Sequence, residues 1–121
     1  MKNVLELEHQ TTSAPISICY GEKVYTKYML KHYGFNNYTI DKSAVTTILT
    51  NNRTGKYSIV VGINKLEDVY QLKGLIVHEL SHVVTELMNE YGFVCDEFRS
   101  YTLQWLYQEV MVFIDNLLKI Q

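Results

Sequence analysis

The sequence predicts an α+β domain, in which helices pack on a small and mainly antiparallel sheet. Segments rich in β-branched residues are confined to the first half of the chain, and two long segments with helical periodicity fill the second half. The chain has 121 residues, of which 47% are hydrophobic and 20% charged, a balance typical of a globular domain with a real core. We therefore expect one domain spanning residues 1–121.

The first half of the chain holds the expected strands. Residues 15–20 alternate loosely between polar and apolar and predict a short strand. Apolar residues then recur at helical spacing over 22–33, and Gly34 follows where a C-cap glycine belongs. Residues 44–50 and 56–63 are rich in β-branched side chains, and the Asn- and Gly-containing segment between them predicts a hairpin with a five-residue turn.

Two long helices are expected in the second half. Asn64 is suited to cap the first of them, and Glu67, three residues on, completes a capping box. This helix is expected to continue to Tyr91, with Gly92 ending it. After a short link, the last helix is expected over about 96–119.

Composition excludes several classes of function. The formal net charge of −2 gives no electrostatic footprint for nucleic acid or an anionic membrane. The N-terminal residues lack the apolar stretch of a signal peptide, and the apolar runs are too short to span a bilayer. Cys19 and Cys95 are too few for a disulfide framework, so we expect two free thiols and a cytoplasmic protein.

The segment His78-Glu79-Leu80-Ser81-His82 is the strongest chemical signal in the chain. A spacing of four on a helix places both imidazoles on one side, one turn apart, where they can bind a single metal ion. Glu79 is then expected beside the open position of the metal, placed to take a proton from a water molecule. Zinc suits this role because it lowers the pKa of a bound water toward neutrality and polarises a carbonyl.

Helical phase separates this pair from the apolar face of its helix. At about 100° per residue, His78 and His82 fall opposite the main apolar stripe, and Glu79 lies between the two faces. The stripe itself consists of Ile76, Leu80, Val83, Val84 and Leu87. Packing in a core is therefore a poor explanation for the two histidines, and an ordinary solvated face is the alternative to a metal site.

A catalytic zinc site needs a third protein ligand and an open fourth position. Thr85 and Met88 stand where a metzincin would have a glycine and a histidine, which excludes that class. Glu97, Asp96 and Glu86 are the acidic candidates, Asp96 being better suited to cap the last helix.

The other metal-binding residue types are weaker candidates. Cys95 is close to Glu97 in sequence, but a thiolate suits a structural zinc site better than a catalytic one. His9 stands in a charged segment and His32 near a helix end, so both are expected at the surface.

Two motifs together resemble a known group of proteins. The sequence His-Glu-Leu-Ser-His-Val-Val at 78–84, followed by Asp-Glu-Phe-Arg-Ser-Tyr-Thr-Leu-Gln-Trp-Leu at 96–106, is similar to small zincin-like metallopeptidases of the gluzincin type that bacteriophages encode. The resemblance spans roughly residues 64–110. It implies a minimal zincin-like fold, a phage or mobile-element origin, and action in the cytoplasm of the host cell.

The resemblance also implies the residues of the site. His78, His82 and Glu97 would bind Zn²⁺, and Glu79 would act as general base and then general acid in peptide-bond hydrolysis. One position departs from the pattern of larger gluzincins, in which an aspartate four residues after the ligand glutamate orients a histidine. Here that position is Tyr101, which forms hydrogen bonds without a fixed negative charge, or stabilises an oxyanion through its hydroxyl group.

The last helix has a second interpretation. Its polar residues form one stripe, which is ordinarily a solvated face, and its other sides are apolar enough to suggest a deeper core or a contact with a partner or a second copy. The stripe consists of Glu97, Tyr101, Gln104, Gln108 and Asp115. The alternative function is therefore a catalytically weak or inactive zincin-like protein that binds a partner protein. In the peptidase hypothesis the partner is a peptide or protein substrate, paired with the 56–63 strand or its hairpin neighbour.

Overall fold

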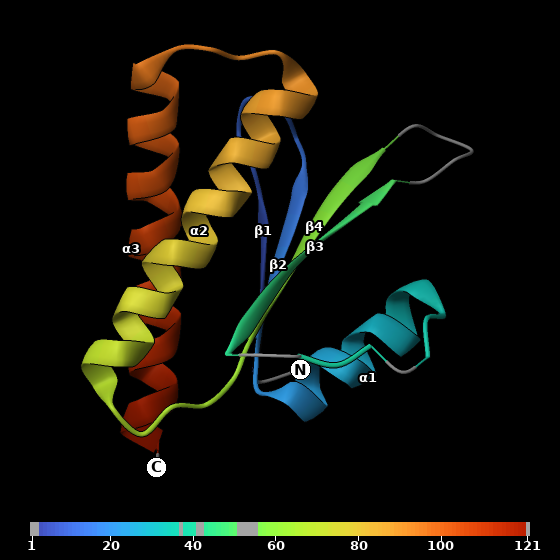
Figure 1. The fold of residues 1–121 in the computed structure, drawn as a ribbon, viewed down its shortest axis with the longest axis vertical. Helices are drawn as coiled ribbons and strands as arrows, with labels where there is room; N and C mark the ends of the chain where they lie inside the picture. Colours follow the sequence, from blue (N-terminus) through green and yellow to red (C-terminus); the bar gives the residue numbers. More distant parts are fainter. Residues whose placement is uncertain (1–2, 37, 41–42, 51–55, 121) are drawn as a thin grey trace. The chain divides into compact units, whose positions relative to one another are not determined.

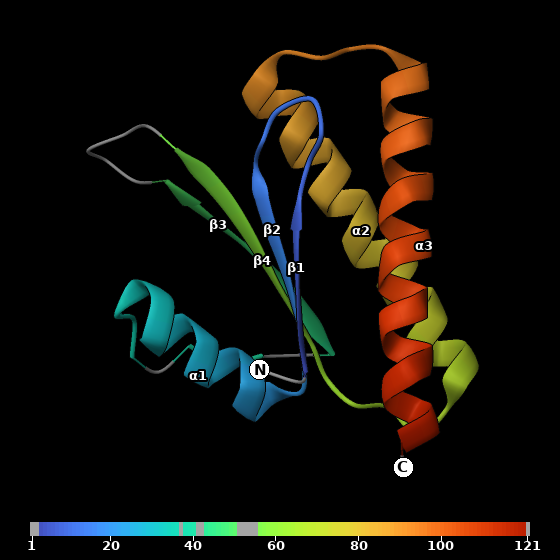
Figure 2. The same cartoon turned by 180° about the vertical axis from the view of Figure 1, so that it is seen from behind.

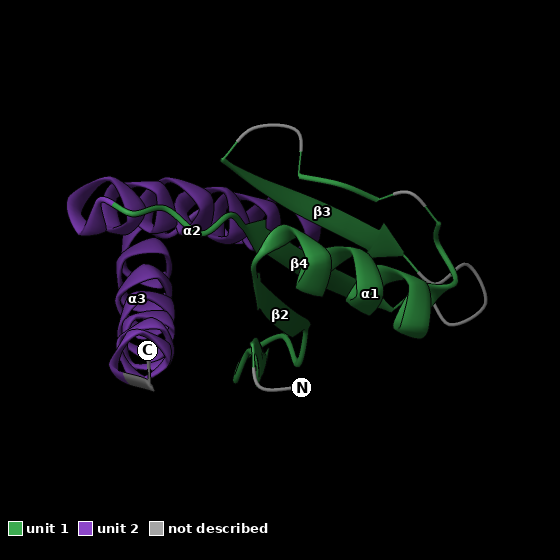
Figure 3. Cartoon of the chain, turned by 90° about the horizontal axis from the view of Figure 1, so that it is seen from below, with its two compact units in different colours: residues 1–67 green, residues 68–121 purple. Residues whose placement is uncertain are grey.

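A computed structural model describes residues 3–36, 38–40, 43–50 and 56–120, and it confirms the α+β class (Figure 1). The turn predicted between the 44–50 and 56–63 strands lies outside the described residues. Two compact units divide the chain, 1–67 and 68–121, and each is treated by itself (Figure 3). The single domain expected over the whole chain stays a prediction.

The first unit contains a four-stranded sheet in the order β1-β2-β4-β3. The strands are β1 (Val4–Glu8), β2 (Pro15–Tyr20), β3 (Ala44–Thr50) and β4 (Tyr57–Ile63). β1 pairs with β2, and β3 with β4, in antiparallel register, whereas β2 and β4 run parallel. The sheet is therefore mainly antiparallel, as predicted. Both faces of β2 and β4 are buried, which explains their nearly continuous apolar sequences.

Strand β1 is not among the predicted elements. Its sequence alternates two leucines with two glutamates, and Leu5 pairs with Ile18 and Leu7 with Ile16 of β2. The alternation is only five residues long, and the two charges make it look like a solvated terminal segment. Pairing with the buried β2 strand, which periodicity does not reveal, makes it an edge strand.

The turn that joins β1 to β2 encloses His9, and the prediction that His9 lies at the surface is wrong. Its side chain and backbone are only 5% exposed. The backbone N–H of Thr12 donates to His9 Nδ1 over 3.1 Å, and the N–H of His9 donates to the Ala14 carbonyl over 3.0 Å. The compact turn, with Ser13 at φ +58°, folds the imidazole into its own hydrogen-bond network. The charged neighbours in the sequence gave no sign of this.

Helix α1 (Glu22–Tyr33) packs on one face of the sheet, and Gly34 ends it in the left-handed conformation, as predicted. Tyr25 lies so close to β4 that a Cβ on Gly62 would be 2.7 Å from its ring, so only glycine fits there. The tyrosine hydroxyl groups are not left unpaired. Tyr25 bonds to Thr47 over 2.6 Å, and Tyr28 to Ser17 over 2.8 Å. Packing is therefore the role of these two tyrosines.

The second unit is a pair of helices, α2 (Val69–Tyr91) and α3 (Asp96–Ile120). They lie side by side and antiparallel, joined by a short link, in both views of the ribbon (Figures 1 and 2). Arg99 of α3 donates from Nη1 to Thr85 Oγ1 of α2 over 3.4 Å, which indicates how the two helices are aligned.

The predicted start of α2 is wrong by several residues. The cap is Asp68, whose carboxylate accepts the backbone N–H groups of Tyr70 and Gln71 over 2.9 and 3.2 Å. Asn64 is still tied to the first unit, because its N–H donates to the carbonyl of Ser43. An aspartate also interacts favourably with the positive end of the helix dipole, which favours the later start.

The ends of the link between the helices are partly as predicted. Gly92 ends α2 in the left-handed conformation, and its N–H donates to the Met88 carbonyl. The N–H of Arg99 donates to the Cys95 carbonyl over 3.2 Å, so Cys95 occupies the cap position of α3. Asp96, expected to cap, is instead the first residue of the helix.

Candidate metal centre

Helix α2 presents two different faces, as the helical phase predicted. The five residues of the predicted apolar stripe are all fully buried: Ile76, Leu80, Val83, Val84 and Leu87. His78 and His82 are exposed, and the side chain of His78 retains 67% of its accessible surface. Burial of one face fixes the helix in rotation, so the two imidazoles project from the other face at a defined spacing.

The two imidazoles converge on one point. His78 Nε2 and His82 Nε2 are 3.1 Å apart, and the rings meet edge to face at 84° with centroids 4.7 Å apart. Two nitrogens bound at 2.0–2.1 Å to a tetrahedral ion would be about 3.3 Å apart. The observed separation is within a few tenths of an ångström of that distance, so the pair fits a metal ion with little movement. In the free protein the same separation suits a hydrogen bond in which one Nε2 carries the proton.

Glu79 completes a group that is close enough to bind a metal ion. Ligand atoms of His78, Glu79 and His82 all lie within 4.8 Å of one another. Glu79 Oε2 is 3.9 Å from His78 Nε2, which is longer than the edge of about 3.3 Å expected if both atoms bound one tetrahedral ion. As found, the carboxylate therefore lies beside the histidine pair without the spacing of a third tetrahedral ligand.

Burial sets the position of Glu79. The residue is only 6% exposed, although its neighbours His78 and His82 are exposed. It stands three residues after Ile76 and four before Val83, so one side of it belongs to the buried stripe. A buried carboxylate beside an exposed metal-binding pair has little freedom to turn away, and its charge acts through a medium of lower dielectric than water.

Ser81, the remaining polar residue of the motif, has a structural role. Its Oγ donates a hydrogen bond to the Val77 carbonyl over 2.9 Å within the same helix. This is the common back-bonding of a helical serine. The proton of the hydroxyl is therefore held within the helix.

The structure does not bring Glu97 into the group. Within the part of the chain that is described, the potential metal-binding cluster consists of His78, Glu79 and His82 alone. The contact between Arg99 and Thr85 places Glu97 on the link side of Thr85 and the histidines on the other. Glu97 is exposed, and its assignment as a ligand stays a prediction.

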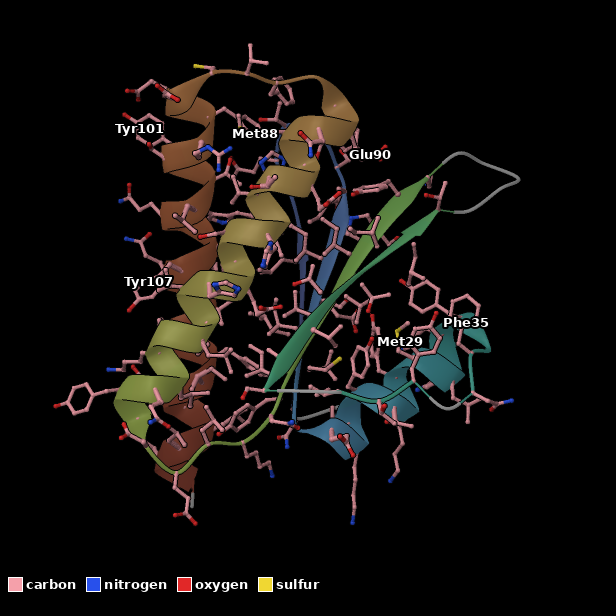
Figure 4. The ribbon with its side chains drawn as sticks, in the orientation of Figure 1. Met29, Phe35, Met88, Glu90, Tyr101 and Tyr107 are labelled. Atoms are coloured by element: carbon pink, nitrogen blue, oxygen red, sulfur yellow. The ribbon has the colours of Figure 1, made fainter. Side chains whose placement is uncertain are left out.

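The other residues predicted near the metal also lie outside the group. Asp96 and Cys95 are exposed at the start of α3, and Glu86 is half-buried on α2. Tyr101 is 67% exposed, and it lies nearer the link than Tyr107 does on the same helix (Figure 4). All five polar residues of the α3 stripe are exposed, as in an ordinary solvated face.

The remaining histidines and thiols do not form a second site with these residues. Burial lowers the pKa of His9. His32 is exposed, and its ring is tilted by 35° against that of Tyr28, with ring centroids 4.2 Å apart. Both cysteines are free, as predicted. Burial, together with the charge of Glu6, raises the pKa of the Cys19 thiol to about 12, so this buried thiol stays protonated and unreactive.

Comparison of the chain with protein-family models, with curated proteins and with solved structures finds no match. None of the helices in the described ranges combines the length and the apolar character needed to cross a membrane.

Proposed function

We propose that this protein is a zinc-dependent peptidase of the minimal gluzincin type, with His78 and His82 as zinc ligands, Glu97 as the third ligand that the resemblance implies, and Glu79 as the catalytic base. The observation that carries the proposal is the convergence of two exposed imidazole nitrogens, 3.1 Å apart, beside a buried carboxylate. The resemblance of the two motifs supports the same reaction. Phage or mobile-element origin and action in the host cytoplasm belong to the proposal and rest on that resemblance.

Zinc is the metal that best suits this donor set. Imidazole nitrogens bind zinc well, whereas calcium and magnesium require several oxygen ligands. The only carboxylate in the described group stands 3.9 Å from the nearer imidazole nitrogen. When bound, zinc would polarise the peptide carbonyl and lower the pKa of a water molecule.

Glu79 supplies the proton transfers. Its carboxylate lies beside the histidine pair, with Oε2 3.9 Å from His78 Nε2. We infer that Glu79 accepts a proton from the attacking water and then donates it to the nitrogen of the leaving amine. Its burial holds the acceptor oxygen in place for both steps.

Replacing Glu79 with glutamine tests this mechanism. The amide cannot accept the proton, so hydrolysis of a mixed peptide library should fall by about 10²- to 10⁴-fold, measured by mass spectrometry of the products. Zinc content should remain that of the unchanged protein, because the two imidazoles are intact. Glu90→Gln, an exposed glutamate on the same helix, is the matched control and should cleave normally. Unchanged cleavage by the Glu79→Gln variant would contradict the mechanism.

A second candidate function is partner binding without catalysis. Two exposed apolar side chains of α3 favour it, since Tyr101 and Val112 are 67% and 62% exposed. In that case Glu79→Gln should leave binding to the partner unchanged. The comparison with a His78→Ala variant then shows whether the metal contributes to binding at all.

A further inference from the structure

We propose that two copies of this chain share one zinc ion through their His78 and His82 pairs, and that this dimer is the closed, inactive form of the site. The inference rests on the zinc binding proposed above and adds a regulatory state to it. Its occupant is a second copy of the same chain, because that copy brings the same two donor atoms.

The first argument is the incomplete ligand set. A closed tetrahedral zinc site takes four protein ligands, and an open one takes three. Among the described residues, one chain supplies two imidazole nitrogens at the spacing of a tetrahedral edge, and Glu79 Oε2 is farther from His78 than such an edge. A twofold axis through the ion doubles the pair to four nitrogens, since an isologous contact presents the same patch from both copies.

The second argument is the surface around the pair. His78 and His82 are exposed, so a second helix can reach them. Gly74 stands one turn before His78 on the same face, it is exposed, and a Cβ built there meets nothing within 4 Å. Gly74, His78 and His82 form a row along the helix. The exposed residues beyond its two ends, Gln71 and Asn89, are neutral. Gly74 therefore leaves space for a second α2 to approach the row at that turn.

The consequence concerns the open position of the metal. Four imidazole nitrogens leave no coordination site for a substrate carbonyl, so the shared ion is not catalytic. Excess zinc provides each chain with its own ion and separates the copies by mass action. The account therefore expects a dimer at one zinc ion for two chains, and active monomers at higher zinc.

Sedimentation velocity of the untagged, full-length protein, first freed of metal and then titrated with zinc chloride, tests the inference. The mass should rise from 14.1 kDa toward twice that value as zinc reaches half an equivalent, and fall again in excess zinc. His78→Ala and His82→Ala should stay monomeric throughout. Glu90→Gln and His32→Ala should dimerise as the unchanged protein does, because both residues lie outside the metal-binding group.

A variant that keeps both ligands separates the shared ion from simple zinc binding. Gly74→Leu places a bulky side chain in the row and should weaken zinc-dependent dimerisation by about tenfold or more, while one zinc ion still binds per monomer. Circular dichroism checks that α2 is intact. A chain that binds one zinc ion and remains monomeric at every ratio would overturn the inference and leave the proposed function standing.

Dimerisation without peptide cleavage is the opposite result, and it separates the two proposals as well. A zinc-dependent dimer whose monomeric, zinc-loaded form cleaves no peptide supports the shared site and overturns the peptidase. Absence of zinc binding in calorimetry of the unchanged protein overturns both.

Discussion

Helices α2 and α3 each carry residues that the sequence predicts to bind the metal, the histidine pair on α2 and Glu97 on α3. In the structure the two sets have different surroundings. On α2 the histidine nitrogens meet at 3.1 Å with a buried carboxylate beside them. On α3 the polar stripe headed by Glu97 is exposed and stays outside the group. The difference shows that candidate ligands on one helix are much easier to place from the sequence than a candidate ligand on the next helix.

The physical reason is the range over which geometry is fixed. Residues four apart on one helix are neighbours by the helical repeat alone, whatever surrounds them. The position of Glu97 relative to His82 depends on where α2 ends, on the link, and on the alignment indicated by the Arg99–Thr85 contact. A change of one turn in that alignment moves a side chain by about 5.4 Å, which is enough to take it out of reach of the metal ion.

The largest expected effect concerns the buried face of α2. Leu80→Ala removes a fully buried side chain directly behind the histidine face, and should lower the free energy of unfolding by about 2–5 kcal/mol. Gln104→Ala, in the exposed stripe of α3, should change it by less than about 0.5 kcal/mol. Urea unfolding followed by circular dichroism measures both. Equal changes in the free energy of unfolding for the two variants would contradict the difference in burial between Leu80 and Gln104.

A comparable effect is expected on zinc affinity from the α2 row. His82→Ala removes one of two converging nitrogens and should weaken zinc binding by at least about 100-fold. Replacing a residue that only hydrogen-bonds to a metal ligand already lowers metal affinity by about 10- to 100-fold. Competition with a chromophoric zinc chelator measures this. An affinity that stays within threefold of the unchanged protein would remove His82 from the site.

The smallest effect is expected from the α3 stripe. Glu97→Gln should weaken zinc binding by about tenfold, less than His82→Ala does, because Glu97 is exposed and joins the ion from outside the group of converging atoms. The same chelator competition serves as the measurement, with His82→Ala as the reference for a true ligand. An affinity within twofold of that of the unchanged protein would remove Glu97 from the ligand set.

The sequence predicted most of the elements and the core of the site. Local signals sufficed for α1, for the glycines that end α1 and α2, and for the phase of His78 and His82 against the apolar stripe. It did not predict β1, whose five residues become a strand only by pairing with β2. The start of α2 was also missed, because Asn64 and Asp68 are both good caps and the bond from Asn64 to Ser43 decides between them.

His9 shows the same limit at a smaller scale. Its charged neighbours predicted a surface residue, but the turn before β2 folds back so that the Thr12 N–H donates to the imidazole. The four histidines therefore divide into a buried one, one in contact with Tyr28 near the end of α1, and a pair whose Nε2 atoms are 3.1 Å apart. Spacing alone identified that pair, because its geometry is internal to one helix.

Metal content tests the central claim most directly. Untagged protein produced with zinc in the medium and purified without chelators should contain between about half and one zinc ion per chain by elemental analysis, and the His78→Ala, His82→Ala double variant should contain almost none. The matched control, His32→Ala, should keep the full content. Zinc absent from the unchanged protein, or present equally in the double variant, would contradict a metal centre on α2.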